Sequence, residues 1–227
     1  MHSVKEIYFA GGEPLVTEEH YLLLDYLIEN RITNLRLRYN TNFSILEFKG
    51  RNILDYWQQF TEVEILASID ESEELGEFIR KELDWSRFVI NREKLRKLPN
   101  IIFKISPTVS VFNINTLPDF YKKCLNLKLI ELDGIYVNLL DRPFHYSCKV
   151  LSEVNKLKIT KKYHNFFDWC CANSIPNSVI TQFKDCIAFM NQDDYHKKYW
   201  AKFESETKRL DQIRDEDYTN VKYPPLN

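Results

Sequence analysis

What this 227-residue sequence lacks narrows the classes of protein it can encode. It has no apolar run approaching the roughly 18 residues needed to span a bilayer, and no basic and apolar leader of the secretory type. It has little excess charge of either sign, since 31 Lys and Arg stand against 33 Asp and Glu, for a net charge of −2. We therefore expect a soluble cytoplasmic protein with no membrane attachment and no general affinity for nucleic acid.

Metal-ligand spacing is also missing. None of the five cysteines forms a C-x-x-C pair, so we expect small buried side chains in a reducing compartment. Two of them are adjacent and would point in different directions on a helix, which leaves at most one for a ligand set. Whether any of the five binds an auxiliary cluster stays open. The cysteines are Cys124, Cys148, Cys170, Cys171 and Cys186.

What the sequence does contain is an alternation of short apolar β-type runs with amphipathic helical segments. Turn residues and helix-starting residues separate the two kinds of segment. Strands separated by helices favour a parallel sheet with right-handed crossovers. The expected strands are 7–9, 34–39, 63–70, 101–111 with a break at Pro107, and 134–139. The expected helices are 17–30, 52–60, 73–81, 85–98 and one that begins at Thr116.

Beyond Arg142-Pro143 the pattern becomes helical. Apolar residues recur at spacings of four and three over 159–170 and 179–190, a further amphipathic helix covers 193–213, and an extended end is expected at 223–226. A basic cluster in this region is expected to be a solvated helix face, with an anionic substrate or peptide as the alternative partner. The cluster consists of Lys156, Lys158, Lys161, Lys162 and His164.

Polar residues follow three of the expected strands, at 11–14, 40–42 and 68–70. The carboxyl ends of parallel strands converge on one face, so these residues are expected to surround a single polar ligand. Arg80 could add a cation for a ligand carboxylate. Each motif also has a simpler explanation: the Gly-Gly segment could be only a turn, Ser68 and Asp70 could cap a helix, and Arg80 could lie on the surface.

These motifs resemble those of the radical S-adenosylmethionine (radical SAM) enzymes. In that family a Gly-Gly-Glu-Pro motif ends the second strand, as Gly11-Gly12-Glu13-Pro14 does here. The family's Thr-Asn-Gly is similar to Thr41-Asn42, with Phe43 in place of the glycine. Its Ser-x-Asp, followed later by Ile-Arg, is similar to Ser68-Ile69-Asp70 with Ile79-Arg80. The resemblance implies an α/β fold: a partial (β/α)6 TIM-like barrel of parallel strands, with five of six units present and a helical C-terminal extension.

A finer likeness is to the branch with a shortened auxiliary domain, the twitch-domain radical SAM proteins. It implies a partial barrel over 1–145, holding the second to sixth βα units, and a twitch-like helical extension over 146–227. The segments that carry it are 77–80, Asp84-Trp85, Asn91, 108–113, Leu117-Pro118, 210–216 and Pro225-Leu226.

The feature that defines the family is absent. Its C-x-x-x-C-x-x-C loop holds three irons of a [4Fe-4S] cluster and leaves the fourth for S-adenosylmethionine. That loop would precede Gly11, but only ten residues do so and none is cysteine. We therefore expect the chain to be the carboxyl-terminal part of a longer protein, inactive in radical generation when alone.

The resemblance assigns roles to individual residues. The Gly-Gly-Glu-Pro segment would hold the methionyl amine of S-adenosylmethionine, and Ser68 with Arg80 its carboxylate. Asn42 and Asp70 would form a polar shell or contact the ribose, and Asn138 would lie on the adenosine side. None is expected to be a catalytic acid or base. The candidate cofactor-binding residues are Gly11, Gly12, Glu13, Pro14, Asn42, Ser68, Asp70, Arg80 and Asn138.

The complete enzyme would generate a 5′-deoxyadenosyl radical that abstracts hydrogen from a peptide, nucleotide or small metabolite. Two other interpretations remain open: a non-catalytic, cluster-less module that binds a partner through the same face, and an unrelated parallel α/β domain. A barrel without its first unit would leave a free sheet edge beside the opening strand, so self-association is expected.

Overall fold

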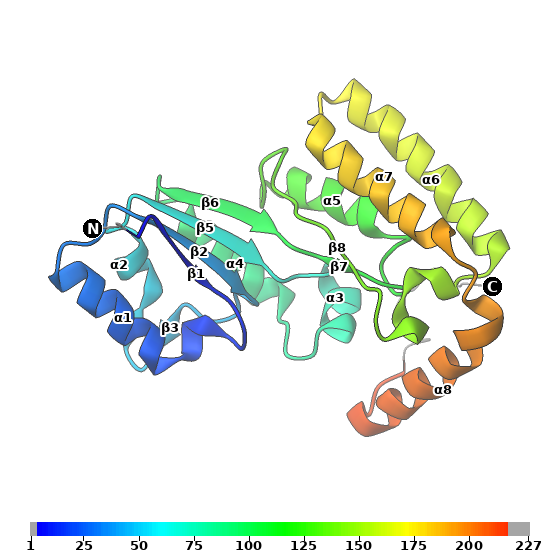
Figure 1. The fold of residues 1–227 in the computed structure, drawn as a ribbon, viewed down its shortest axis with the longest axis horizontal. Coiled ribbons are helices and arrows are strands. Elements are labelled where there is room, and N and C mark those ends of the chain that lie inside the picture. The colour runs from blue at the N-terminus through cyan, green and yellow to red at the C-terminus, as the bar shows by residue number, and fades with distance from the viewer. Residues whose placement is uncertain (1–3, 218–227) are drawn as a thin grey trace.

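A four-stranded parallel sheet organises the first part of the fold in a computed structural model that describes residues 4–217. The strands lie in the order β1-β2-β5-β6, and every neighbouring pair is parallel. This arrangement confirms the expected parallel sheet (Figure 1). The strands are β1 (Glu6–Phe9), β2 (Arg36–Thr41), β5 (Glu62–Ala67) and β6 (Ile101–Ile105).

The two faces of the sheet differ in chemistry. Along β2 the buried residues Leu37 and Tyr39 alternate with the half-buried Arg36 and Arg38, as the alternating sequence predicts. The buried face packs against helices. On the other face, Glu64 Oε2 lies 2.8 Å from Arg36 Nη2 and 3.0 Å from Arg38 Nε. Ion pairs thus join β2 to β5 on this face.

Helices follow the strands at the positions that the sequence predicts. Asn52 begins α2 by accepting a hydrogen bond from Leu54 N, and Asp84 caps α4 in the same manner through Arg87 N. Thr17 precedes α1, but its hydroxyl donates to Glu13 O instead of capping the helix. The helices are α1 (Glu18–Glu29), α2 (Ile53–Trp57), α3 (Glu73–Ile79), α4 (Trp85–Leu95) and α5 (Leu117–Asn126), with a single turn η1 (Pro14–Val16) before α1.

The fourth and fifth expected strands are shorter than the sequence predicts. Beyond β6 the chain breaks at Pro107, as expected, and continues as β7 (Thr108–Val109), which pairs in parallel with β8 (Asn138–Leu139) in a separate sheet. Within residues 4–217, a single isolated bridge, Ile105 to Ile135, joins the fifth segment to the main sheet. A small hairpin of β3 (Glu47–Phe48) and β4 (Arg51–Asn52) was not predicted.

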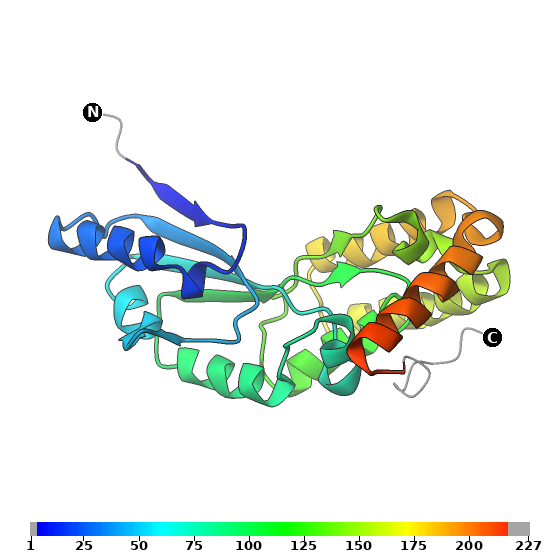
Figure 2. The same ribbon diagram turned by 90° about the horizontal axis from the view of Figure 1, so that it is seen from below.

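The last quarter is helical, as predicted. Helices α6 and α7 pack side by side, and α8 returns toward α3, where Arg214 Nη1 donates to Phe78 O at 3.3 Å (Figures 1 and 2). The elements are η2 (Phe144–Tyr146), η3 (Cys148–Val150), α6 (Glu153–Ala172), α7 (Asn177–Gln192) and α8 (His196–Arg214). Within residues 4–217, no helix combines the length and apolar character needed to cross a membrane.

The proposed division at residues 145 and 146 stays a prediction. A single cluster of buried side chains includes residues on both sides of it. For example, Tyr163 of α6 donates a hydrogen bond to Ile114 O at 2.7 Å, and the rings of Tyr121 and Phe183 lie 5.6 Å apart. The extended end expected at 223–226, and with it Pro225-Leu226, lies outside the described residues.

Candidate functional site

The Gly-Gly segment forms an open loop at the carboxyl end of β1. Gly11 and Gly12 have φ values of +86° and +60°, in the region that favours glycine. A Cβ at either position would meet nothing within 4 Å, so the glycines serve the backbone shape and no chain segment approaches them closely. Among the hydrogen bonds of residues 4–217, none uses the carbonyl oxygens of these two glycines. Both carbonyls are therefore available to a ligand.

The Glu13 carboxylate links the end of β1 to the end of β2 by hydrogen bonds. Its Oε1 accepts from Thr41 Oγ1 at 2.6 Å and from Leu15 N at 3.2 Å, and its Oε2 accepts from Asn42 N at 2.8 Å. Sequence reasoning assigned Glu13 to the ligand. The geometry shows that both carboxylate oxygens are already engaged by the chain, while Pro14 is buried at the start of η1.

Asn42 and Phe43 shape the loop after β2. Asn42 Oδ1 accepts from Ser44 N at 3.3 Å, which closes a turn of the Asx type, and also from Ser44 Oγ at 2.9 Å. Phe43 has φ of +56° although its ring is fully buried, 5.3 Å from the ring of Phe103. The position where the radical SAM family carries glycine thus adopts the conformation that glycine favours.

Ser68 and Asp70 lie where β5 ends. Ser68 N donates to Thr41 O at 2.7 Å, and in the described part of the chain the Ser68 hydroxyl has no hydrogen-bond partner. Asp70 is buried. Its Oδ2 accepts from Arg80 Nη2 at 3.0 Å and its Oδ1 from Thr108 N at 2.7 Å. Arg80 therefore pairs with Asp70, whereas the resemblance implies that it acts with Ser68 on a ligand carboxylate, which stays a prediction. Within residues 4–217, the buried Arg80 Nε has no hydrogen-bond partner.

Asn138 forms no hydrogen bond with another predicted site residue within residues 4–217. Its Nδ2 donates to Ser106 Oγ at 3.0 Å. Ser106 was missed, although it directly follows β6 and obeys the same strand-end rule. Asn113, the last residue of the segment 108–113, was not a predicted site residue, and its Nδ2 donates to Asp70 O at 2.9 Å.

Together these contacts make one continuous polar edge in strand order. Glu13 joins β1 to β2, the Thr41 carbonyl joins β2 to Ser68, and Asp70 joins the end of β5 to Thr108 of β7. A cavity of about 460 Å³ adjoins the Asp70 end, between α3, β7 and α8. Arg80 and Phe78 are among the residues that line it. The edge offers free carbonyls at one end and a guanidinium at the other, which suits a ligand with an ammonium and a carboxylate.

The cysteines do not fit an iron-sulfur cluster. Four of the five cysteines are buried, as expected, but the expected burial is wrong for Cys171, which is exposed. The buried Cys170 and the exposed Cys171 point in different directions, as predicted for neighbours on a helix. Burial raises the pKa of Cys148 to about 12 and that of Cys170 to about 11, and it also raises the pKa values of Cys124 and Cys186. Burial thus stabilises the protonated form of these thiols in the protein without a metal. In residues 4–217, no group of three or more His, Cys, Asp or Glu is arranged to hold a metal ion.

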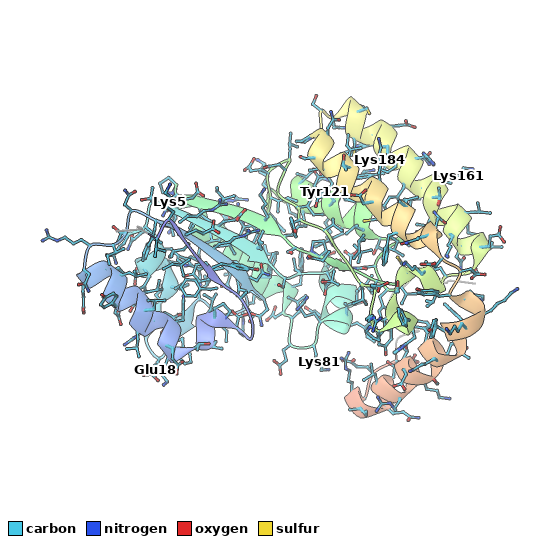
Figure 3. All side chains as sticks on the ribbon, in the orientation of Figure 1. Lys5, Glu18, Lys81, Tyr121, Lys161 and Lys184 are labelled. Atoms are coloured by element: carbon cyan, nitrogen blue, oxygen red, sulfur yellow. The ribbon has the colours of Figure 1, made fainter. Side chains whose placement is uncertain are left out.

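The basic cluster of α6 does not form one cationic surface. Lys156 is buried and donates to Asp193 O at 2.7 Å, while Lys162 pairs with Asp119 at 2.6 Å. Lys161 is exposed on α6 (Figure 3). The expected solvated helix face is therefore confirmed for Lys161 and wrong for Lys156, which is buried against the loop before α8.

Comparison with known proteins gives one informative match. No family model matches the sequence, and no curated protein does. A solved structure described as native anSMEcpe with bound AdoMet and Cp18Cys peptide matches with 20% identity and a TM-score of 0.50, over 76% of this chain and 49% of that one. The chain thus spans about half the length of anSMEcpe, which is a radical SAM enzyme. We conclude that this chain has an α/β fold, with a parallel sheet and C-terminal helices, that resembles a partial radical SAM barrel.

Proposed function

We propose that the polar edge binds S-adenosylmethionine and that the chain is the cofactor-binding part of a radical SAM enzyme. The observation that carries this proposal is the set of groups that the fold leaves unused along one edge. These are the carbonyls of Gly11 and Gly12, the hydroxyl of Ser68 and the buried Nε of Arg80. An unpaired buried donor is costly, and a ligand carboxylate would satisfy it.

The residues then divide into two kinds. The glycine carbonyls accept the cofactor's ammonium group, and Ser68 with Arg80 donates to its carboxylate. Glu13, Pro14, Asn42 and Asp70 position these groups, and Asn138 contacts the adenosine side. With a reduced [4Fe-4S] cluster, S-adenosylmethionine supplies radical chemistry for hydrogen abstraction, but the residues that the structure describes do not fit such a cluster.

Isothermal titration of S-adenosylmethionine into the purified chain tests the proposal. Arg80→Lys keeps a positive charge beside Asp70 and removes the planar fork, so we expect it to weaken binding about tenfold. Arg87→Lys is the matched control, because Arg87 lies on the exposed face of α4 with its Nε 3.8 Å from Asp84. Equal losses in the two variants, or no binding by the unsubstituted chain, would refute the site.

The chain alone is expected to bind the cofactor without cleaving it. After anaerobic iron-sulfur reconstitution and reduction, we expect neither 5′-deoxyadenosine nor methionine in a chromatographic assay. Their appearance would show that this chain holds a working cluster without the family's cysteine loop. The bound peptide in the anSMEcpe structure makes peptides the first substrate class to test with a complete enzyme, ahead of small metabolites.

A non-catalytic, cluster-less binding module is the second candidate. The arrangement of the cysteines favours it, because residues 4–217 bring no three His, Cys, Asp or Glu side chains together to hold a metal. The DNA upstream of Met1 discriminates between the two. An in-frame C-x-x-x-C-x-x-C sequence there supports the enzyme, and a stop codon followed by a ribosome-binding site supports the module.

A further inference from the structure

The cavity of about 460 Å³ between α3, β7 and α8 combines apolar and cationic lining residues. Its volume lies in the range of about 300 to 1,000 Å³ that is typical of sites for small organic molecules. It extends from the polar edge, with which it shares Asp70, Arg80 and Thr108, to the last turns of α8. We name it the α8 cavity and define it by six of its lining residues: Phe78, Phe112, Leu140, Tyr146, Leu210 and Arg214.

The apolar residues of the α8 cavity are covered only in part by the fold. All five of them are half-buried: Phe78, Phe112, Leu140, Tyr146 and Leu210. The ring centroids of Phe78 and Phe112 lie 5.7 Å apart, and those of Phe112 and Tyr146 lie 5.6 Å apart. These three rings come from α3, from the loop after β7 and from η2, so the fold brings them together from separate segments. An apolar ligand that covers them would remove apolar surface from water.

Arg214 supplies a guanidinium group whose donors the fold uses only in part. Its side chain is 28% exposed, and its Nη1 donates to Phe78 O at 3.3 Å. The same Nη1 lies 3.9 Å from Glu216 Oε2, which is too far for a hydrogen bond. In the part of the chain that the structure describes, no hydrogen bond uses Arg214 Nε or Nη2. These two donors form the fork with which a guanidinium group binds a carboxylate through two parallel hydrogen bonds.

The other cations of the α8 cavity already have partners. Arg80 donates to Asp70, and Lys81 donates to Glu216. Three cations and two carboxylates are among the lining residues, a formal excess of one positive charge when all are ionised. The charge of the cavity therefore favours an anionic ligand, and Arg214 is the cation whose fork is left for it.

We propose that the α8 cavity binds a small arylalkyl carboxylic acid. The carboxylate accepts hydrogen bonds from Arg214 Nε and Nη2, and the aromatic ring of the ligand lies against Phe78 and Phe112. The carboxylate has two sources, a free acid or the carboxyl end of a short peptide, and both present the same chemistry to the site. The inference goes beyond the binding of S-adenosylmethionine and does not require it, because it rests on α8 and the aromatic rings and not on the glycine carbonyls.

Titration calorimetry at pH 7.5 and low salt tests the proposal with 4-phenylbutanoate and with 4-phenylbutanamide, which has the same apolar body and no charge. We expect one acid per chain, and about tenfold weaker binding of the amide, because only the carboxylate pairs with the guanidinium group. Arg214→Gln should weaken binding of the acid about tenfold and leave that of the amide unchanged. Arg209→Gln is the matched control, because Arg209 is exposed on α8 with its Nη2 2.9 Å from Glu206 Oε2, and it should change neither affinity.

A gain of affinity provides the second variant. Glu216→Gln removes the carboxylate that competes for Arg214 and Lys81, so the acid should bind about threefold more tightly, which a misfolded protein cannot imitate. Tighter binding of acetyl-glycyl-phenylalanine than of 4-phenylbutanoate identifies a peptide as the source of the carboxylate, and equal or weaker binding identifies a free acid.

Five results would overturn the proposal. They are no binding of the acid, equal affinities for acid and amide, equal losses in Arg209→Gln and Arg214→Gln, no gain in Glu216→Gln, and displacement of the acid by S-adenosylmethionine. The last result would assign the α8 cavity to the cofactor. Failure of S-adenosylmethionine to bind at all would leave the affinities for the acid as expected, so the two proposals fail separately.

Discussion

His20 should make the stability of the fold fall steeply in mild acid. The ring lies on the buried face of α1, 5% exposed, between the rings of Phe9 and Tyr21. Its Nε2 lies 2.9 Å from the Tyr39 hydroxyl, and its buried Nδ1 has no partner. Burial lowers the pKa of His20 from 6.5 to about 4. The folded protein therefore holds the neutral imidazole.

The sign and size of the effect follow from linkage. The pKa of His20 is about 4 in the folded state and 6.5 in the unfolded state. Between these two pH values the unfolded state binds a proton that the folded state does not, so the free energy of unfolding is unaffected above pH 6.5 and decreases as the pH falls toward about 4. At 1.36 kcal/mol per pKa unit the full loss is roughly 3 kcal/mol, of which about 2 kcal/mol has gone by pH 5. This is a large share of the typical 5 to 15 kcal/mol of domain stability.

Urea unfolding, followed by tryptophan fluorescence at several values between pH 7.5 and pH 5, measures this loss. The difference in the free energy of unfolding between the unsubstituted chain and His20→Gln, measured at each pH, gives the contribution of the imidazole, because the carboxyl groups titrate alike in both proteins. Glu71 has a raised pKa and acts in the opposite direction, but it cancels in this difference. His164→Gln, on the exposed side of α6, should keep the original slope. Parallel stability curves for the chain and for His20→Gln would refute the reasoning.

Other perturbations test the backbone and the sheet edge. Phe43→Gly should be about 1 kcal/mol more stable than Phe43→Ala in urea unfolding, because both lose the buried ring and only alanine keeps the strain of φ +56°. Gly12→Ala should lower the free energy of unfolding by about 1 kcal/mol, because only the backbone strain at φ +60° opposes the new Cβ, which meets no atom within 4 Å. Gly76→Ala should lower it several times more, because the new Cβ would lie 2.1 Å from Glu71 O. Thermal unfolding ranks the two variants. The chain should self-associate through β1 in sedimentation velocity, and Tyr8→Glu, which puts a charge on that edge strand, should shift it toward the monomer. Equal stability in either pair of variants, or a monodisperse unsubstituted monomer, would contradict these expectations.

The order and type of the main elements were predictable because each has a local signature. Alternation fixes β2, since Leu37 and Tyr39 must face the helices while Arg36 and Arg38 face away. Contacts between distant segments have no such signature. Nothing in the sequence indicates that Asp70 Oδ1 accepts from the β7 backbone, or that the chain after Pro107 leaves the main sheet to form a separate pair of strands.

The convergence of the strand-end residues was predictable from the sequence, and the hydrogen bonds of their side chains were not. Strand-end polar residues converge because parallel strands end on one side, and this topology placed Glu13, Asn42 and Asp70 on one edge. The side chains of Glu13 and Asp70 form hydrogen bonds to neighbouring strand ends. Whether such bonds form depends on differences of a few tenths of an ångström in distance, which the residue pattern does not determine. Ser106 directly follows β6 as Ser68 directly follows β5, so the rule that selects strand-end polar residues should have selected both.

The residues that resemble a cofactor motif are thus largely the residues that hold the strand ends together. Glu13 satisfies three donors of the chain, and Asp70 binds both Arg80 and Thr108 N. Replacing Glu13 would leave Asn42 N without this acceptor, and replacing Asp70 would do the same to Thr108 N, at a cost of about 1 to 3 kcal/mol each, whether or not a ligand binds nearby. Loss of binding in such variants therefore cannot distinguish a ligand site from a structural joint. Ser68 can, because its hydroxyl has no partner within residues 4–217. Ser68→Ala should leave the unfolding free energy nearly unchanged and weaken S-adenosylmethionine binding, and unchanged binding in a calorimetric titration would remove Ser68 from the site.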